Sequence, residues 1–196
     1  MKILFVNGSP RREGNSDVVI EELENYCIDK GIEHFSLRLR EKNINSCVGC
    51  ESCHNKERRC SQDDDFSNDI FEVIMKVDAI LIVSPVYQGG VTGIMKNFMD
   101  RCEMFRKDRL LKNKLCGGVA IGGYLGGGQE LTLMQIQYFA HICAMRYIAS
   151  WGKVRSHLGG FCIAFNKQEV RDDKDGISSC KNVLLEMLDC FNQTNL

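Results

Sequence analysis

The chain has 196 residues, of which 44% are hydrophobic and 26% are charged, so it can bury a core and a disordered chain is excluded. Its 25 Lys and Arg residues are interspersed with 26 Asp and Glu residues for a formal net charge of −1, which argues against a nucleic-acid partner. The apolar run at residues 3–6 is too short for a signal-peptide core or a membrane span, so we expect a cytosolic protein without membrane contact.

Apolar runs and helical patterns alternate along the chain. The runs at 2–6 and 79–83 show no polar alternation, which is typical of strands covered on both faces, whereas Phe66, Ile70 and Ile74 recur at helical spacing. In chain order we predict a strand at 2–6, a helix ending before Gly31, a strand at 33–39, a helix over 66–77, a strand at 79–83, a helix at 93–105, a strand at 115–121, a helix at 130–146, a strand at 161–165 and a helix at 177–191. This alternation predicts one α/β domain over residues 1–196, with a doubly wound, five-stranded parallel sheet and helices on both faces.

The loop at residues 7–16 lies directly between the first predicted strand and the first helix. Its hydroxyls, its backbone N–H groups and the helix N-terminus suit a phosphate monoester, and Arg11 can add a bidentate contact. The loop lacks the Gly-Lys-Ser/Thr ending of a Walker loop, and Gly8 and Gly14 do not have the GxGxxG spacing, so ATP and a Rossmann-bound NAD are disfavoured. A simple turn with a capped helix has the same residue types.

Eleven cysteines in a chain without an export signal are not expected to form disulfides, because cytosolic thiols are kept reduced. Four of them, Cys47, Cys50, Cys53 and Cys60, fall within fourteen residues of a polar insertion that we predict at about 41–65. The other seven are scattered, and we interpret them as small core side chains: Cys27, Cys102, Cys116, Cys143, Cys162, Cys180 and Cys190.

The four clustered thiols predict a metal centre. Closely spaced thiolates on one loop can each ligate a different iron of a cubane, so our main hypothesis is a [4Fe-4S] cluster. Zinc is less favoured, because sites of four cysteines usually pair two CxxC units across a longer gap. Cys50, Cys53 and His54 also match a c-type haem attachment, but haem attachment requires export.

Two further loops follow predicted strands. The loop at 84–90 offers backbone donors and acceptors to the edge of a flat heteroaromatic ring, with Tyr87 packing beside it. The loop that begins at Gly122 has five glycines in seven positions, which permits close approach of a ligand. A plain turn and a flexible hinge are the alternatives. Because the carboxyl ends of parallel strands meet at one edge of a sheet, we expect the three loops to share one site.

Together these motifs resemble a known family. The motifs GSPR at 8–11, GNS at 14–16, SPVY at 84–87 and KNFMDR at 96–101 resemble the NADPH-dependent FMN reductase family of flavodoxin-like proteins. The segment at 109–114, the motif GGQE at 127–130, Thr132 and the pair at 135–136 are similar to its iron-sulfur flavoprotein branch. Members of the family need not all carry a cluster, so an empty cysteine site is the remaining alternative.

The resemblance implies a flavodoxin-like fold and one FMN. It implies that the phosphate lies on Ser9, Arg11, Gly14, Asn15 and Ser16, and that the isoalloxazine ring lies against Pro85, Val86, Tyr87, Gln88, Gly89, Gly122 and Gly123. Tyr124 and Leu125 stand where a more polar loop is expected.

The function that follows is an FMN-dependent oxidoreductase that couples two-electron and one-electron partners through FMN and the cluster, with no side chain needed as nucleophile or general acid. One alternative is a cluster-free NAD(P)H-dependent FMN or quinone reductase, in which NAD(P)H is the donor. Another is a non-enzymatic electron carrier for a ferredoxin-like partner. The resemblance also implies a homodimer or homotetramer in which the cysteine loop nears a neighbour's flavin.

Overall fold

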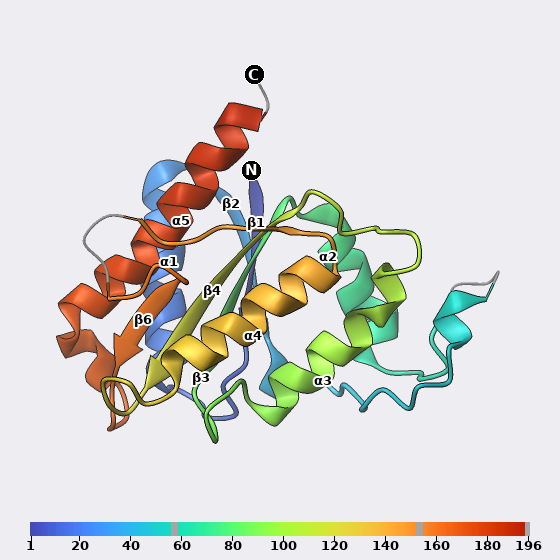
Figure 1. The fold of residues 1–196 in the computed structure, drawn as a ribbon, viewed down its shortest axis with the longest axis horizontal. Helices are drawn as coiled ribbons and strands as arrows, with labels where there is room; N and C mark the ends of the chain where they lie inside the picture. Colours follow the sequence, from blue (N-terminus) through green and yellow to red (C-terminus); the bar gives the residue numbers. More distant parts are fainter. Residues whose placement is uncertain (56–58, 152–154, 195–196) are drawn as a thin grey trace.

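The structure, a computed structural model, describes residues 1–55, 59–151 and 155–194 (Figure 1). Short helical turns lie at Leu39–Glu41, Ser52–His54, Cys102–Phe105 and Glu169–Asp172, and a π-helical turn at Phe66–Ile70. Within the described residues, no helix has both the length and the apolar character that a bilayer span requires. The strands and longer helices are β1 Lys2–Asn7, α1 Asn15–Lys30, β2 Glu33–Arg38, α2 Phe71–Lys76, β3 Ala79–Pro85, α3 Gly93–Arg101, β4 Leu115–Gly122, α4 Gln129–Ile142, β5 Arg146–Tyr147, β6 Gly160–Ile163 and α5 Lys174–Thr194.

All strand pairs in the sheet are parallel, in the order β2-β1-β3-β4, followed by an edge position that β5 and β6 share. The strand β5 pairs with the start of β4 at Leu115 and Cys116, and β6 pairs with its end from Val119 to Gly122. The predicted α/β class with a parallel sheet is confirmed, and the fifth position consists of two short strands. This order is that of flavodoxin-like sheets, which bind ligands at the carboxyl ends of their strands beside the β1/β3 switch point.

Two cores cover the two faces of the sheet. Ile3 and Phe5 of β1 pack with α1 and α5, whereas Leu4 and Val6 pack with α2, α3 and α4. Figure 1 shows these two helical layers on opposite sides of the strands. Because both faces of the central strands are covered, their sequences are apolar throughout rather than alternating.

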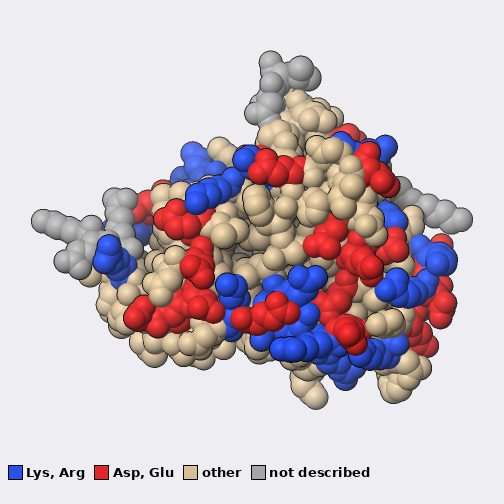
Figure 2. Space-filling model, turned by 180° about the vertical axis from the view of Figure 1, so that it is seen from behind, with Lys and Arg blue, Asp and Glu red and all other residues tan. Residues whose placement is uncertain are grey.

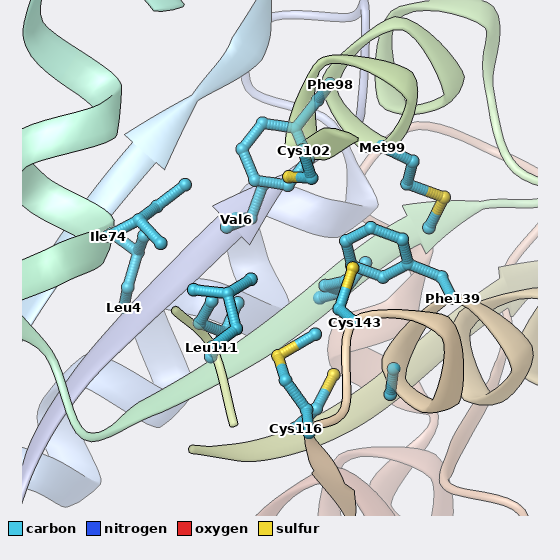
Figure 3. Packing of buried hydrophobic residues seen from close by; sticks show 14 of the residues in the cluster. Leu4, Val6, Ile74, Phe98, Met99, Cys102, Leu111, Cys116, Phe139 and Cys143 are labelled. Carbon is cyan, nitrogen blue, oxygen red and sulfur yellow. The ribbon is translucent and has the colours of Figure 1, made fainter. Parts of the chain in front are cut away.

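The scattered cysteines belong mostly to these cores. Six of the seven are buried; Cys102, Cys116 and Cys143 belong to one cluster, in which Figure 3 shows Cys102 beside Phe98 and Cys143 beside Phe139. Burial raises the pKa of Cys143 to about 12, so its thiol stays protonated and unreactive. The interpretation as core side chains is therefore confirmed for these six. Cys190 is half-buried and accepts a hydrogen bond of 3.2 Å from Nη2 of Arg146.

The predicted helix at 130–146 is wrong in its last turn. The helix α4 ends at Ile142, and Ala144 has a left-handed backbone with φ of 60°. The chain then reverses, and the N–H of Arg146 donates to the carbonyl of Lys114 over 2.9 Å to start β5. The gain from this pairing with β4 outweighs the local helical pattern.

A buried carboxylate joins β6 to the start of α5. Both oxygens of Asp173 accept hydrogen bonds of 2.6 Å from Arg155, and they also accept from the backbone N–H groups of Ile163 and Gly176 over 2.7 and 3.0 Å. Burial alone would raise the pKa of Asp173, but these donors outweigh burial and lower it. The ionised form of Asp173 therefore stabilises the fold.

We expect Asp173→Asn to lower the unfolding free energy at pH 7 by about 1–3 kcal/mol, the range for a hydrogen-bonded charge. An unfolded Asp titrates at about 3.9 and the folded one lower, so the contribution is present above about pH 4 and is lost as the pH falls further. Urea unfolding at several pH values should show the unfolding free energies of Asp173→Asn and the native protein converging in acid. Asp172→Asn, at an exposed neighbouring position, is the control for the loss of one negative charge. A pH-independent gap between Asp173→Asn and the native protein would contradict the assignment.

Candidate functional site

The loops after β1 and β3 are joined by hydrogen bonds at the carboxyl edge of the sheet. The N–H of Gly8 donates to the carbonyl of Val83 over 2.8 Å, and the hydroxyl of Thr92 donates to the carbonyl of Gly8 over 2.6 Å. Thr92 is buried, and its Oγ1 also accepts the N–H of Met95 at the start of α3. One hydroxyl thus fixes the first loop against the second, a role that sequence reasoning missed because the partners are 84 residues apart.

The loops after β3 and β4 also lie together. Gln88 and Gly89 have positive φ values of 50° and 77° in a tight turn closed by Tyr87 and Gly90. At Gly128, whose φ is 100°, a Cβ atom would lie 3.0 Å from the Cα atom of Gly89. Only glycine allows this approach. The three loops therefore meet at one edge, as the parallel topology predicts.

The first loop is organised around Asp17 in the first turn of α1. Its carboxylate accepts hydrogen bonds from Asn7 Nδ2 at 2.7 Å, from the N–H of Gly14 at 3.1 Å and from Arg40 Nη1 at 2.9 Å. Asn7 in turn accepts the N–H of Ser9 over 2.8 Å. Sequence reasoning missed Asp17, although an acidic residue in the first turn of a helix is an expected signal.

Ser16 is the residue of this loop best placed for an anion. Its hydroxyl is buried at the N-terminus of α1 and has no hydrogen-bond partner among the described residues. A helix N-terminus adds backbone N–H groups and a positive dipole end. Arg11 is exposed at the rim, whereas the side chain of Asn15 is engaged with Asn166 and Val170 at 2.8 and 3.2 Å. The loop therefore fits a phosphate monoester, whose oxygens could accept a hydrogen bond from the hydroxyl of Ser16.

The loops after β3 and β4 offer a second kind of surface. Pro85, Val86 and Gly89 are half-buried, Tyr87 and Gln88 are exposed, and Gly122 ends β4 with Gly123 after it. A fourth segment, which sequence reasoning missed, adds Phe165, whose ring centroid lies 5.4 Å from that of Tyr124. Backbone groups and apolar side chains in this arrangement suit the edge of a flat ring.

Gln129 shapes the loop after β4. It is fully buried, and its Nε2 donates to the carbonyl of Tyr124 over 2.7 Å. A Cβ atom at Gly122 would collide with this amide, which explains the glycine there. Gln129 lies within the GGQE motif, but only its burial reveals the contact with Gly122.

A groove of about 1090 Å³ runs beside these loops between α3 and α4. Tyr87 and Gly90 line one part of it, and Glu103 and Arg106 line another. Its α4 side carries exposed apolar side chains at helical spacing: Leu131, Met134, Tyr138 and Ile142. Figure 2 shows acidic and basic side chains interspersed on the opposite view of the molecule, as the composition predicts.

The four clustered cysteines line one cavity of about 210 Å³. We call residues 45–62 the Cys loop, of which residues 56–58 lie outside the described part. Cys47 and Cys50 are exposed, and Cys53 and Cys60 are half-buried. Figure 1 shows the described part of this loop extending from the α3 side of the molecule.

The surroundings differ among the thiols. Hydrogen bonds with Ser52 and Ser61 lower the pKa of Cys50 to about 7, and Sγ of Cys50 lies 2.9 Å from Oγ of Ser61. Burial raises the pKa of Cys53. Within residues 1–55, 59–151 and 155–194, no three His, Cys, Asp or Glu side chains already lie close enough to hold a metal ion. Four thiols around one cavity nevertheless form the donor set that iron-sulfur clusters use, so the residues fit such a group.

The turn after α3 holds the middle of the Cys loop. Oε1 of Glu103 lies 2.9 Å from Nε2 of His54, and Nζ of Lys107 donates to the carbonyl of His54. Glu103 lines both the Cys cavity and the groove. The Cys cavity and the groove beside Tyr87 are therefore neighbours, with Glu103 between them.

The chain is similar to known proteins over most of its length. The family model described as "NADPH-dependent FMN reductase" matches residues 1–156. The chain is 34% identical over 183 residues to the iron-sulfur flavoprotein MJ1083 of Methanocaldococcus jannaschii, an alignment that covers 93% of each chain. It is 30% identical over 190 residues to the iron-sulfur flavoprotein of Methanosarcina thermophila, covering 96% of this chain and 94% of the relative.

Among solved structures, one described as a flavone reductase has a TM-score of 0.69 with this chain. It shares 17% sequence identity, and the match covers 95% of this chain and 62% of that one. At this identity the likeness concerns the fold alone.

Proposed function

The chain belongs to the NADPH-dependent FMN reductase family, and from this premise we propose that it is an iron-sulfur flavoprotein that passes electrons between two-electron and one-electron partners. It is an FMN-dependent oxidoreductase. The proposal depends most on one observation, the meeting of three glycine-bearing loops at the carboxyl edge of the sheet, where the buried hydroxyl of Ser16 has no partner among the described residues. When bound, FMN supplies the exchange of a hydride or of single electrons.

The loop after β1 would hold the phosphate of FMN. Ser9 and Ser16 contribute buried hydroxyls, Arg11 a charge at the rim, and Gly14 and Asn15 the backbone that opens α1. Because Asp17 already orders this loop through Asn7 and Gly14, the donors are arranged before the phosphate arrives.

The loops after β3 and β4 would hold the ring. The turn at 85–89 would face its edge with backbone donors and acceptors, and Gly122 and Gly123 would lie beside it at the end of β4. Tyr124 and Phe165 add an aromatic wall that limits access of water at this side.

We expect Ser16→Ala to weaken FMN binding roughly 10- to 100-fold, because a hydrogen bond to a charged group contributes about 1.5–3 kcal/mol. The FMN-free variant should be as stable as the native apoprotein, since the hydroxyl has no partner there to lose. Titration of apoprotein with FMN, followed by flavin fluorescence, measures the first quantity, and urea unfolding measures the second. Ser36→Ala, in the middle of β2, is the control for FMN affinity; its hydroxyl donates to Glu24, so only its stability should fall. Unchanged FMN affinity in Ser16→Ala would remove Ser16 from the site.

Cys47, Cys50, Cys53 and Cys60 would hold the cluster, for which we favour [4Fe-4S]. The support is the single cavity that all four line and the name of the relatives, iron-sulfur flavoproteins. The cytosolic location expected from the sequence stays a prediction.

We expect Cys53→Ser to lose most of its iron and sulfide while keeping FMN, because a hydroxyl is a poor replacement for a ligating thiolate. Iron, sulfide and flavin are assayed after anaerobic purification. Cys190→Ser, at a half-buried position in α5, serves as the control and should keep its iron. Iron retained equally in both variants would argue against the cluster assignment.

The groove beside Tyr87 favours a second candidate, the cluster-free NAD(P)H-dependent reductase. It has room for a nicotinamide nucleotide and carries Lys96 and Arg106 among its lining residues. Anaerobic mixing with NAD(P)H or with reduced ferredoxin separates the candidates. An iron-sulfur flavoprotein should exchange electrons with ferredoxin, and loss of its iron should slow that exchange. Fast NAD(P)H oxidation with quinone by iron-free protein would favour the reductase, and exchange with ferredoxin without any turnover would favour a simple carrier.

A second copy of the chain is the partner proposed for the apolar face of α4. Leu131 and Tyr138 on this face are 58% and 69% exposed. Exposing apolar side chains to water is unfavourable, and a self-complementary dimer would bury them. We expect light scattering to give a dimer or tetramer, and Tyr138→Glu to shift the mass toward the monomer. A monomeric native protein would contradict this proposal without affecting the FMN site.

A further inference from the structure

A buried ion pair lies beneath the Cys loop. Arg101, at the end of α3, and Asp64, just after the loop, have side chains that are 1% and 0% exposed. Nη2 of Arg101 donates to Oδ1 of Asp64 over 3.0 Å, and Nη1 donates to Oδ2. The guanidinium also lies over the ring of Phe66, with Cζ 5.2 Å from the ring centroid. A charge buried this deeply is retained only where it has specific partners.

This pair ties both ends of the Cys loop to α3. On the first side, Nη1 of Arg101 donates to the carbonyl of Asn45 over 3.1 Å, and Asp64 accepts the N–H of Asn45 at 2.9 Å. On the second side, Nη2 donates to the hydroxyl of Ser67 at 2.9 Å, and that hydroxyl donates to the carbonyl of Gln62 at 2.8 Å. Asn45 and Gln62 each stand two residues outside the first and last clustered cysteines. One guanidinium therefore fixes the width of the loop.

Arg101 also has a donor left over. Its Nε–H is buried and has no hydrogen-bond partner among the described residues. Burial alone would lower the pKa of Arg101, but Asp64 and the nearby Cys60 raise it. The positive charge of the guanidinium thus lies near the last of the four thiols, Cys60.

We propose that Arg101, held by Asp64, is a positioning residue for the iron-sulfur site: it closes the two ends of the Cys loop and places its positive charge near Cys60. This inference rests on the cluster of the proposed function. Net charge and hydrogen bonds to sulfur set the potential of an iron-sulfur cluster. A cation at Cys60 favours the more negative, reduced form and so raises the reduction potential, whereas Asp64 opposes it.

Three variants distinguish an electrostatic effect of Arg101 on the cluster from a purely structural role in holding the Cys loop. Arg101→Gln removes the cation, Arg101→Lys keeps it with fewer donors, and Asp64→Asn removes the opposing carboxylate. Lys2→Gln, at the exposed start of β1 where Lys2 pairs with Glu33, is the control for the loss of one positive charge. Iron and sulfide per FMN are measured after anaerobic purification, and the midpoint potential of the cluster by an electron-spin-resonance titration. FMN content and circular dichroism report folding.

We expect Arg101→Gln to hold less than half the native iron, Arg101→Lys to recover part of the loss, and Lys2→Gln to match the native protein. In the clusters that remain, the potential should fall in Arg101→Gln and rise in Asp64→Asn. These opposite shifts distinguish an electrostatic role from lost packing, which would reduce occupancy in both variants without reversing the sign. If Arg101→Gln does not fold, the Asp64→Asn potential and the Arg101→Lys iron content decide the question.

Full iron in Arg101→Gln with an unchanged potential would overturn the inference, and so would shifts of the same sign in Arg101→Gln and Asp64→Asn. Native protein that holds FMN but no iron would instead remove the cluster, and with it this role of Arg101.

Discussion

Parallel pairing of β1, β3 and β4 is the constraint from which the rest of the structure follows. Both faces of these strands are apolar, so the sheet is stable only when helices cover it on both sides, and each crossover helix returns the chain to the same edge. The loops after the three strands are thereby brought together at their carboxyl ends. The site that we propose for a phosphate and a flat ring lies at this edge, where open parallel sheets bind their ligands.

Small residues and single hydrogen bonds give that edge its form. Thr92 joins the first loop to the second, and the glycine at 128 lets the third loop approach the turn at Gly89. Asp17 arranges the first loop, and a buried serine at 16 remains with an unused hydroxyl. Among the described residues this hydroxyl has no partner, so it remains available to a ligand.

The Cys loop is supported in a different way. It has little regular structure in its described part and contributes little to the apolar cores, so it depends on polar anchors from α3 and the turn that follows. Arg101 and Asp64 hold its ends, and Glu103 contacts its middle through His54. Glu103 also lines the groove beside the loops that follow β3 and β4. Anchoring the thiols to α3 therefore sets their place relative to the loops at the sheet edge.

The sequence by itself determined the α/β class, the alternation of strands and helices, the three loops and the cysteine spacing, because burial on both faces, helical period and glycine-rich turns are local patterns. Only the tertiary structure decided that residues 143–147 leave the helix for an edge strand, that Thr92 contacts Gly8, and that Arg101 lies beneath the Cys loop. These contacts join residues up to 84 positions apart, and the energy of pairing or of burying a charge there has no signature in the neighbouring residues. Local residue patterns therefore indicated the loops and the cysteine segment, whereas the side chains that fix these segments in place follow from long-range packing.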